Sequence, residues 1–459
     1  MAACLIAAPA DAEAPPSERV SLSVPGLFPG FRPTIRDYVV RCHDQPVTVD
    51  VHVSGGWQAA IDSGPFRSGN FSQTVPLSSG RAFRITFTES GHPELYRYYV
   101  RCLSDSFPAY TYTRYGPVSP QYFTATRTDQ RYAMIFNNYG VPIWWIHGLA
   151  GNARVLPSGN VIWFDHLFHR WEIHRLDGSL IRVLGPPGEL LDHHDLQFLY
   201  GGDYLVGEKV EQGPVDTTAY GGSSATIFNA ELQQVSPDRE PVWDWKNQDH
   251  ISLDETGRWW PYAIDHDYDV AHWNSIEPAG GSVIASFRHL DAVYKIKKST
   301  GEIVWKLGGT TTPQSLEVRE DPYDYTFGGQ HDARLLPDGT LTVFDNRSYL
   351  PTPAPPRAVR YAIDENPGTA TLLQSITDPD VPASYCCGSA RLLSNGDWLI
   401  DWGSARQHPI AGYTPDGVRT FLLRFPSHAS YRAVPVPAGA VTAKDLRAGM
   451  DVMCSSGCD

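Results

Sequence analysis

A hairpin-like segment that recurs along most of the chain restricts the possible folds more than any other feature of the sequence. Each copy has a short apolar run, a turn containing glycine and a second apolar run, which together predict two antiparallel strands. The five copies are ARVLPSGNVIWFD from Ala153, LQFLYGGDYLVGE from Leu196, SIEPAGGSVIASF from Ser275, ARLLPDGTLTVFD from Ala333 and ARLLSNGDWLIDW from Ala390. The 40 glycines and 37 prolines are dispersed along the chain, as expected for many short strands separated by turns, so we predict an all-β protein.

A second type of hairpin alternates with the first and occurs six times. Its copies are IFNNYGVPIWWIHG, IHRLDGSLIRVLG, IFNAELQQVSPDREPVWDW, VYKIKKSTGEIVWKLGG, VRYAIDENPGTATLLQSI and IAGYTPDGVRTFLLRF. One hairpin of each type makes a four-stranded antiparallel sheet, which is one blade of a β-propeller. We therefore predict a six-bladed β-propeller over residues 116–436, closed by a strand in YRAVPVP near residue 431 that removes the exposed sheet edges. The alternative is two or three unrelated β domains.

The segments that flank the repeats have different patterns. Residues 18–115 alternate apolar and polar positions, as in VTVDVHV, and predict a small N-terminal β-sandwich domain. Residues 437–459 are expected to form a C-terminal tail that carries a pair of cysteines. Residues 1–17 are interpreted as the remnant of a secretory signal peptide, with a disordered Ala/Pro-rich tail as the alternative. The first interpretation predicts a secreted or periplasmic protein.

Cysteine usage agrees with an oxidising compartment. The seven cysteines are Cys4, Cys42, Cys102, Cys386, Cys387, Cys454 and Cys458, and removal of a signal peptide with Cys4 would leave an even number. Cys42 and Cys102 end two similar strand-like runs, so a disulfide between them is plausible, and Cys454 and Cys458 could close a small loop. The adjacent Cys386 and Cys387 could stay reduced, bridge each other under strain or pair elsewhere.

Charge and motif content exclude several classes of function. The formal net charge of −14 disfavours a nucleic-acid-binding protein, which would need a basic face. No uninterrupted apolar run reaches the length of a membrane span. No paired Cys-x-x-Cys spacing suggests zinc, and no GxxxxGK phosphate-binding loop occurs. We therefore expect no zinc site of paired cysteines and no nucleotide cofactor.

Histidines occupy one equivalent position in three successive repeats. Counting eight residues back from the turn glycine of each first-type hairpin gives Gly151, His194, His272, His331 and Gly388. In a propeller the innermost strands line the central channel, so the three imidazoles are expected to converge at its mouth, with the glycines leaving space beside them. Asn274, two residues after His272, is expected to face the same way, and Arg288 returns to the same end on the second strand.

Three imidazoles, an amide and a guanidinium suit a compact oxyanion such as sulfate or phosphate, because they supply a nucleophile or base, several donors and a fixed positive charge. Two other interpretations stay open. The histidines could merely satisfy the backbone of turns, or they could bind a metal, although Arg288 is unfavourable beside a metal ion. Asp195 and Asp332 follow their histidines directly and are expected to point to the opposite face.

Three segments resemble the bacterial arylsulfate sulfotransferases that do not use the nucleotide donor PAPS. DVAHWNSIEP with ASFRHLD is similar to that family's Asp-Trp-x-His-x-Asn-Ser-Ile segment and its following Ser-x-Arg-His, and GGQHDARLLPDGTLTVFDN is similar to its Gln-His segment. SYRAVPVP resembles the closing strand. The resemblance implies a six-bladed propeller after a small N-terminal β domain. It also implies that His331 is a nucleophile that forms a transient sulfohistidine.

The same resemblance places His272, Asn274 and Arg288 around the sulfuryl oxygens. His194 matches a further active-site histidine, with His193 as the alternative. The implied reaction moves a sulfuryl group from an aryl sulfate donor to a phenolic acceptor, such as a secondary metabolite, in two steps, with a neighbouring histidine as acid and base. A hydrolase that uses the same histidines, a propeller enzyme with another acceptor, and a non-catalytic binding propeller are the alternatives, because propellers have many functions.

Overall fold

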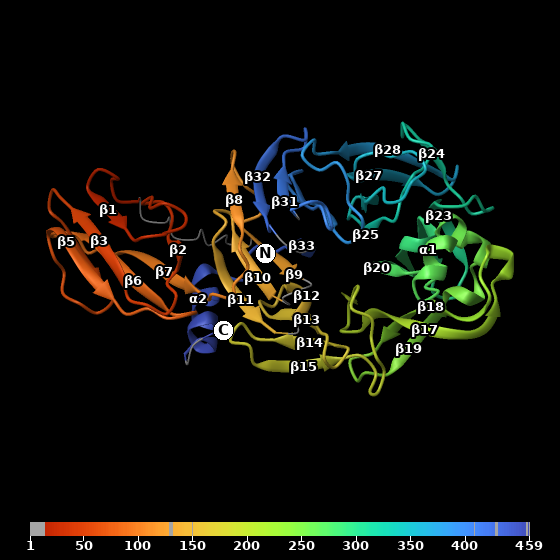
Figure 1. Cartoon of the computed structure of the whole chain (residues 1–459), viewed down its shortest axis with the longest axis horizontal. Coiled ribbons are helices and arrows are strands. Elements are labelled where there is room, and N and C mark those ends of the chain that lie inside the picture. The colour runs from red at the N-terminus through yellow and green to blue at the C-terminus, as the bar shows by residue number, and fades with distance from the viewer. Residues whose placement is uncertain are drawn as a thin grey trace, which may run out of the picture. The chain divides into compact units, whose positions relative to one another are not determined.

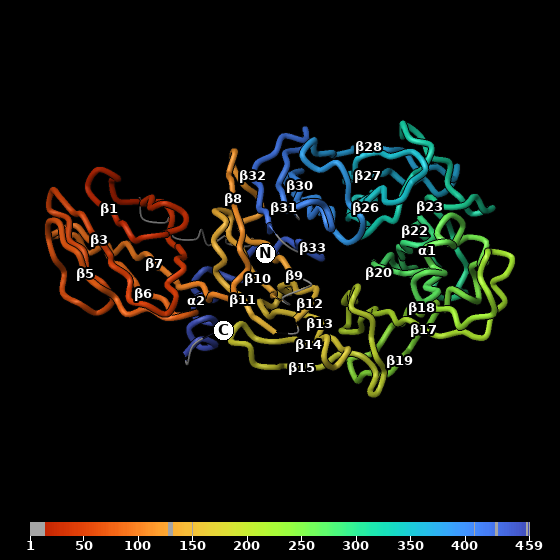
Figure 2. Tube along the Cα trace, in the orientation of Figure 1, coloured from red at the N-terminus to blue at the C-terminus, as the bar shows by residue number. Residues whose placement is uncertain are grey.

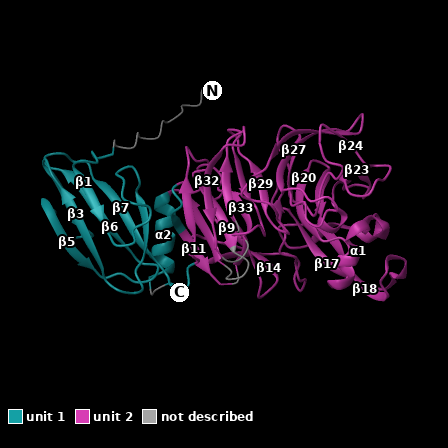
Figure 3. Ribbon diagram, turned by 45° about the horizontal axis from the view of Figure 1, so that its top comes forward, with its two compact units in different colours: residues 1–107, 139–143, 443–459 teal, residues 108–138, 144–442 magenta. Residues whose placement is uncertain are grey.

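The computed structural model describes residues 14–127, 132–148, 150–407, 409–426, 430–455 and 458. The chain forms two compact units, shown in Figure 3. Unit 1 comprises residues 1–107, 139–143 and 443–459, and unit 2 comprises residues 108–138 and 144–442. The interpretation of residues 1–17 as a signal remnant concerns a segment of which residues 1–13, with Cys4, lie outside the described residues.

In the part of unit 1 that the structure describes, two sheets lie around one hydrophobic core. The first sheet has the order β1 (Val20–Ser23), β3 (Val47–Val53), β5 (Gly69–Val75), and the second has the order β2 (Asp37–Arg41), β7 (Tyr96–Leu103), β6 (Ala82–Glu89), β4 (Trp57–Ile61). The sequence of β3 explains why this segment is a strand. Val49, Val51 and Val53 are buried while the residues between them are exposed, which is the period-two pattern of a half-buried strand. Side chains from both sheets share a single core cluster.

The end of the chain, expected as a tail, contains helix α2 (Ala443–Met453) and groups with unit 1. Leu446, Gly449 and Met450 are its buried residues, a spacing that puts them on one face of the helix. Arg447 binds Asp37 at 2.8 Å and Asp451 binds Arg101 at 2.7 Å. Disulfides join Cys42 to Cys102 and Cys454 to Cys458.

Among the described residues, unit 2 contains six sheets (Figures 1 and 2). Five of them combine one hairpin of each type, two of these with an added strand, and the remaining sheet combines a second-type hairpin with β9 and β33. In strand order, the first two sheets are β11 (Pro142–His147), β10 (Tyr132–Asn137), β9 (Tyr122–Arg127), β33 (Ser430–Pro435), and β12 (Ala150–Val155), β13 (Val161–Asp165), β14 (Arg170–His174), β15 (Leu180–Leu184). The third and fourth are β16 (Gln197–Phe198), β17 (Tyr204–Asp216), β18 (Ser224–Val235), β19 (Pro241–Lys246), and β20 (Trp273–Ala279), β21 (Ser282–Phe287), β22 (Ala292–Lys297), β23 (Ile303–Gly308). The last two are β24 (Glu317–Arg319), β28 (Thr369–Ile376), β27 (Arg357–Asp364), β26 (Thr340–Asp345), β25 (His331–Leu335), and β29 (Ser389–Leu392), β30 (Trp398–Asp401), β31 (Pro409–Tyr413), β32 (Arg419–Arg424), β8 (Thr111–Arg114). The strand predicted in YRAVPVP is β33, and it pairs antiparallel with β9.

Helical segments are short. Besides α2, those in the described ranges are α1 (Trp260–Asp265) and the 3₁₀ turns η1 (Thr218–Tyr220), η2 (Asn247–Asp249), η3 (Leu253–Trp259) and η4 (Arg288–Leu290). Within the described part of the chain, none of the helices has the length and apolar character needed to cross a membrane.

A β-bulge recurs near the start of the first strand of several sheets. In β25 the pairing passes from His331–Phe344 to Arg334–Thr342, so one residue is extra on the β25 side. Similar shifts occur in β12 after Gly151 and in β20 after Trp273. Bulges re-aim side chains and are common beside active sites, and those in β20 and β25 lie next to His272 and His331.

Candidate functional site

The three predicted histidines lie at the beginning of first strands, where the backbone departs from regular extension. His331 is the first residue of β25, and His272 directly precedes β20 with φ of +49°. His194 precedes β16. The rings of His194 and His272 lie 5.0 Å apart, centre to centre, in an edge-to-face arrangement. The charges of Arg288, His272 and His194 each act on His331, which brings the four residues into one electrostatic cluster.

His331 is held in one tautomer by its neighbours. Its Nδ1 lies 2.8 Å from Oδ1 of Asn346 and 3.0 Å from the carbonyl oxygen of Gly329. Both partners accept, because Nδ2 of Asn346 faces the carbonyl of Cys387 at 3.0 Å and so leaves Oδ1 for the imidazole. Nδ1 therefore carries the proton, and Nε2, which accepts from the backbone N–H of Cys387 at 3.2 Å, keeps a lone pair.

His331 is only 2% exposed, and its surroundings favour the neutral ring. Burial first, and then the positive charge of Arg288, hold the pKa of His331 well below the ordinary 6.5. The hydrogen bond to Asn346 opposes this shift without reversing it. A neutral imidazole with an unprotonated Nε2 is the chemical form that a nucleophile requires.

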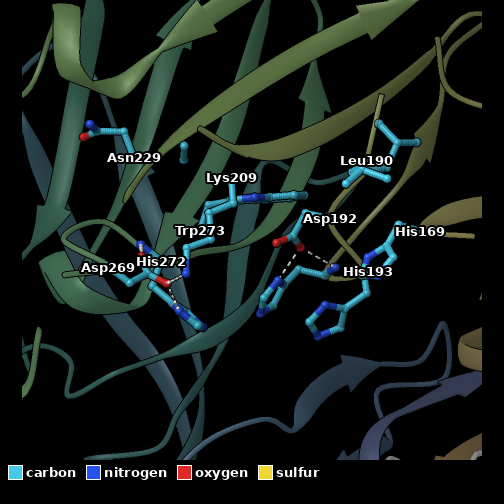
Figure 4. Close-up of a pocket in the computed structure, with 12 residues that line it drawn as sticks. His169, Leu190, Asp192, His193, Lys209, Asn229, Asp269, His272 and Trp273 are labelled. Atoms are coloured by element: carbon cyan, nitrogen blue, oxygen red, sulfur yellow. Dashed lines mark hydrogen bonds and ion pairs between the residues drawn. The ribbon is translucent and has the colours of Figure 1, made fainter. Parts of the chain in front are cut away.

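The other two histidines have carboxylate partners instead of an amide, and Figure 4 labels the pair of His272 and Asp269. Nδ1 of His272 lies 2.8 Å from Asp269 Oδ2, and Nδ1 of His194 contacts Asp192 Oδ1. Burial alone would raise the pKa of Asp192, but the charge of His194 and its hydrogen bond lower it to about 2. A carboxylate stabilises an imidazolium, which an amide cannot do by charge, so these two pairs suit proton transfer.

A cavity of about 390 Å³ opens beside these two pairs. It is lined by His169, Leu190, Leu191, Asp192, His193, His194, Lys209, Asn229, Ala230, Asp269, His272 and Trp273. His193, the alternative to His194 in the sequence analysis, therefore lines the same cavity as His194. Burial, and then the charge of His194, lower the pKa of His193 to about 3. His331, Asn274 and Arg288 are buried and are not among the lining side chains.

Arg288 opens η4, directly after β21, and lies within a network that reaches both His272 and the segment after β28. Its backbone N–H donates to the carbonyl of His272 at 2.8 Å, and its guanidinium donates to the carbonyl of Tyr385 at 3.1 Å. The guanidinium also lies 4.6 Å from the ring centre of Trp259. Its Nε is buried without a partner, so the guanidinium keeps one unused donor.

Asn274 lies at a bulge, where simple strand alternation does not apply. The bulge between Trp273 and Ser275 breaks the alternation, and Nδ2 of Asn274 donates to the carbonyl of Gln330 at 2.8 Å. Its Oδ1 is buried and has no partner. Asn274 is thus tied to the residue that precedes His331, a position from which it can orient that segment.

The expectation that Gly151 and Gly388 leave open space is wrong. A Cβ on Gly151 would lie 2.2 Å from Nε2 of His166, and one on Gly388 would lie 2.5 Å from the ring of Phe344. Gly388 also has φ of +101°. Aromatic rings fill the space, so glycine is needed there for close approach.

Asp195 and Asp332 belong to a buried charge network that the sequence interpretation missed. Arg334 binds Asp195 and Asp332, both at 2.8 Å, and Glu277 at 3.1 Å, so it connects three sheets. Arg391 adds a contact of 2.6 Å to Asp332. The repeated Ala-Arg at the start of first-type hairpins, Arg154, Arg334 and Arg391, was the available signal.

Two groups of the described residues have the ligand types and spacing to hold a metal ion: Asp192 with His193 and His194, and Asp269 with His272 and His289. In the second group both nitrogens of His289 are engaged. Its Nδ1 lies 2.6 Å from the carbonyl of Asp269, and its Nε2 accepts from Arg288 at 2.6 Å. A guanidinium bonded to a ligand nitrogen opposes a metal there.

Comparison with known proteins identifies the family. The sequence pattern described as Arylsulfotransferase (ASST) matches residues 103–419, more than half of the chain. The chain therefore belongs to the arylsulfotransferase family, and the resemblance seen in the sequence is confirmed. No curated protein matches the sequence.

Similar solved structures are remote. The β-propeller domain of Cps50 (Swd1) from Myceliophteria thermophila is 12% identical with a TM-score of 0.38, and the match covers 62% of this chain and 90% of that one. A quinonprotein alcohol dehydrogenase-like protein from Bacteroides thetaiotaomicron is 10% identical with a TM-score of 0.34, over 89% and 98% of the two chains. Likenesses of this size do not bear on function.

Proposed function

We propose that the protein is an extracytoplasmic arylsulfate sulfotransferase that moves a sulfuryl group between phenolic compounds through a sulfohistidine at His331. The six sheets of unit 2, with β33 paired to β9, are proposed to close into a six-bladed propeller, and the two sheets of unit 1 to form a β-sandwich. Family membership supports the reaction class. The observation that carries the mechanism is the neutral His331 with its proton on Nδ1 and its electron pair on Nε2.

In the first step, Nε2 of His331 attacks the sulfur of an aryl sulfate. A nitrogen–sulfur bond forms, the bond between sulfur and the aryl oxygen breaks, and the phenolate leaves with that electron pair. The proposed acid is the imidazolium form of His272 or His194, which gives its Nε2 proton to the phenolate and keeps its Nδ1 proton on the neighbouring aspartate contact. Arg288 supplies a fixed positive charge for the sulfuryl oxygens, and each such donor is worth about 2.7–4 kcal/mol of barrier.

In the second step, the same histidine, now neutral, removes the proton of an acceptor phenol. The phenolate attacks the sulfur, the nitrogen–sulfur bond breaks, and His331 regains its electron pair. Because the second step is the chemical reverse of the first, the same histidine acts as acid in one and as base in the other. The proposed reaction uses neither a nucleotide nor a metal. Asn274 is proposed to position the Gln330–His331 segment.

The extracytoplasmic location is proposed from the disulfides Cys42–Cys102 and Cys454–Cys458, which persist in oxidising compartments. The physiological donor and acceptor are proposed only as classes, an aryl sulfate and a phenol.

The reaction is tested by incubating the protein with p-nitrophenyl sulfate, with and without added phenol. Release of nitrophenol that depends on phenol is expected for transfer. Release without phenol would indicate a hydrolase, and no release from wild type would contradict the proposal. His331→Ala should release none, while His92→Ala, an exposed histidine of unit 1, should behave as wild type.

A further inference from the structure

Beside His331 lies a pair of free cysteines whose side chains the proposed reaction does not use. Cys386 and Cys387 are half-buried, with their sulfur atoms 2.7 Å apart, and Cys386 Sγ lies 2.9 Å from Ser404 Oγ. The two flanking residues on the N-terminal side, Ser384 and Tyr385, also touch the site, because Ser384 contacts Asn346 at 3.0 Å and the Tyr385 carbonyl accepts from Arg288. This short segment therefore contacts Asn346 and Arg288, two of the groups around the nucleophile.

The peptide bond between the two cysteines connects them to the nucleophile. Its N–H, from Cys387, donates to Nε2 of His331, and its carbonyl, from Cys386, accepts from the N–H of Ser404 at 2.9 Å. Cys387 has φ of +63°, and a Cβ on Gly403 would lie 2.3 Å from the Cys386 carbonyl oxygen, so the peptide is closely confined. When Nε2 carries a sulfuryl group, the same N–H is within reach of a sulfuryl oxygen.

We propose that Cys386 and Cys387 form a redox-active dithiol whose oxidation to a disulfide turns the Cys387 N–H away from His331 and lowers the rate of sulfuryl transfer. The bond would close a small ring that contains the Cys386–Cys387 peptide, so its formation must change the backbone angles on both sides of that N–H. The inference rests on the proposed function of His331.

The chemistry of the pair fits a reversible change. Two thiols lose two electrons and two protons, and a disulfide oxidant such as glutathione disulfide is reduced to two thiols. Adjacent Cα atoms lie about 3.8 Å apart, below the roughly 4.4–6.8 Å that disulfides prefer. A strained disulfide of this kind is readily reduced, as regulatory disulfides are. The hydrogen bond from Cys387, together with Ser404 and the charge of Arg288, also lowers the pKa of Cys386 to about 6 despite burial, so a thiolate is available for exchange.

The test compares the full-length protein after treatment with dithiothreitol and with glutathione disulfide. Peptide mapping should show that the peptide carrying both cysteines loses two hydrogens on oxidation, while the Cys42–Cys102 and Cys454–Cys458 disulfides are the same in both samples. Phenol-dependent release of nitrophenol should fall by roughly tenfold or more on oxidation, up to the 10²–10³-fold cost of losing one oxyanion donor. It should recover with dithiothreitol.

Variants and a second readout separate this inference from the proposed reaction. Cys386→Ser and, separately, Cys386→Ala should turn over at the same rate under both conditions. In protein labelled with ¹⁵N-histidine, the Nε2 resonance of His331, assigned with His331→Asn, should shift on oxidation of wild type but not of Cys386→Ser. A shift of the His331 resonance in a protein without any turnover would contradict the proposed reaction but support the coupling between the cysteine pair and His331. A disulfide that forms with neither a shift nor a change in rate would overturn the coupling, as would failure of the disulfide to form.

Discussion

Replacement of Asn346 tests whether the tautomer of His331 matters. Asn346→Ala removes one of the two acceptors at Nδ1, and the Gly329 carbonyl remains. A neutral hydrogen bond contributes about 0.5–1.5 kcal/mol, so the rate of sulfuryl transfer to His331 should fall about two- to tenfold. Complete loss of an orienting group costs up to about 10⁴ in kcat in a comparable triad, which sets the upper limit.

Asn346→Asp makes the sharper test, because it keeps an acceptor and adds a charge. A carboxylate this close raises the pKa of a histidine by about 1–3 units. In wild type the pKa of His331 lies well below 6.5, so the ring stays neutral as pH falls through 6.5. In the variant the ring should protonate at higher pH, and the acid side of the rate profile should move upward by about that amount.

The assay is the burst of nitrophenol on rapid mixing with p-nitrophenyl sulfate without acceptor, measured across pH. Asn366→Asp, at an exposed asparagine, is the matched control and should follow the wild-type profile. If both Asn346 variants fold, and their burst rates and pH profiles overlie those of wild type, the tautomer has no role and the reasoning is refuted.

Three further results are expected. Arg288→Ala should lower kcat/KM about 10²–10³-fold, since it removes the fixed charge at the sulfuryl oxygens; a loss of less than fivefold in steady-state assays would assign that role elsewhere. Arg334→Ala should lower the free energy of unfolding in urea by up to about 3–5 kcal/mol, because it removes the cation closest to Asp195 from a buried charge network, although Arg391 still binds Asp332. Arg319→Ala, with its side chain 51% exposed, should leave the unfolding midpoint unchanged. Burial, and then the charges of His272 and Arg288, hold the pKa of His289 well below 6.5. Below pH 6.5 the unfolded chain therefore binds a proton that the folded chain does not bind. The free energy of unfolding should fall as the pH drops below 6.5, by up to about 1.4 kcal/mol per pH unit for each such histidine. His289→Gln should flatten this slope and His92→Gln should not; equal slopes for wild type and His289→Gln would contradict it.

The alternating hairpins were predictable because each one has its apolar runs and its turn residues within one short segment. The run LLPDGTLTVFD carries its own turn, so β25, β26 and their counterparts follow from residue order. The facing of individual side chains did not follow, because the bulges in β20 and β25 insert a residue that alternation cannot anticipate. The facing of Asn274 stays a prediction for that reason.

The candidate site was predictable only where it is periodic. His194, His272 and His331 share one position in the repeat, and the structure brings them into one cluster. Their partners share none: Asp192 lies two residues before its histidine, Asp269 three residues before, and Asn346 fifteen residues after. Such partners are fixed by loop geometry, which residue spacing does not encode.

The central claim is that His331 carries the sulfuryl group between donor and acceptor. Its most direct test is the intact mass of the protein after brief exposure to p-nitrophenyl sulfate alone, followed by peptide mapping. The account predicts a gain of one sulfuryl group on the peptide that contains His331, its loss when phenol is added, and no gain in His331→Ala. Turnover that depends on phenol without any adduct, or an adduct that persists in His331→Ala, would contradict it.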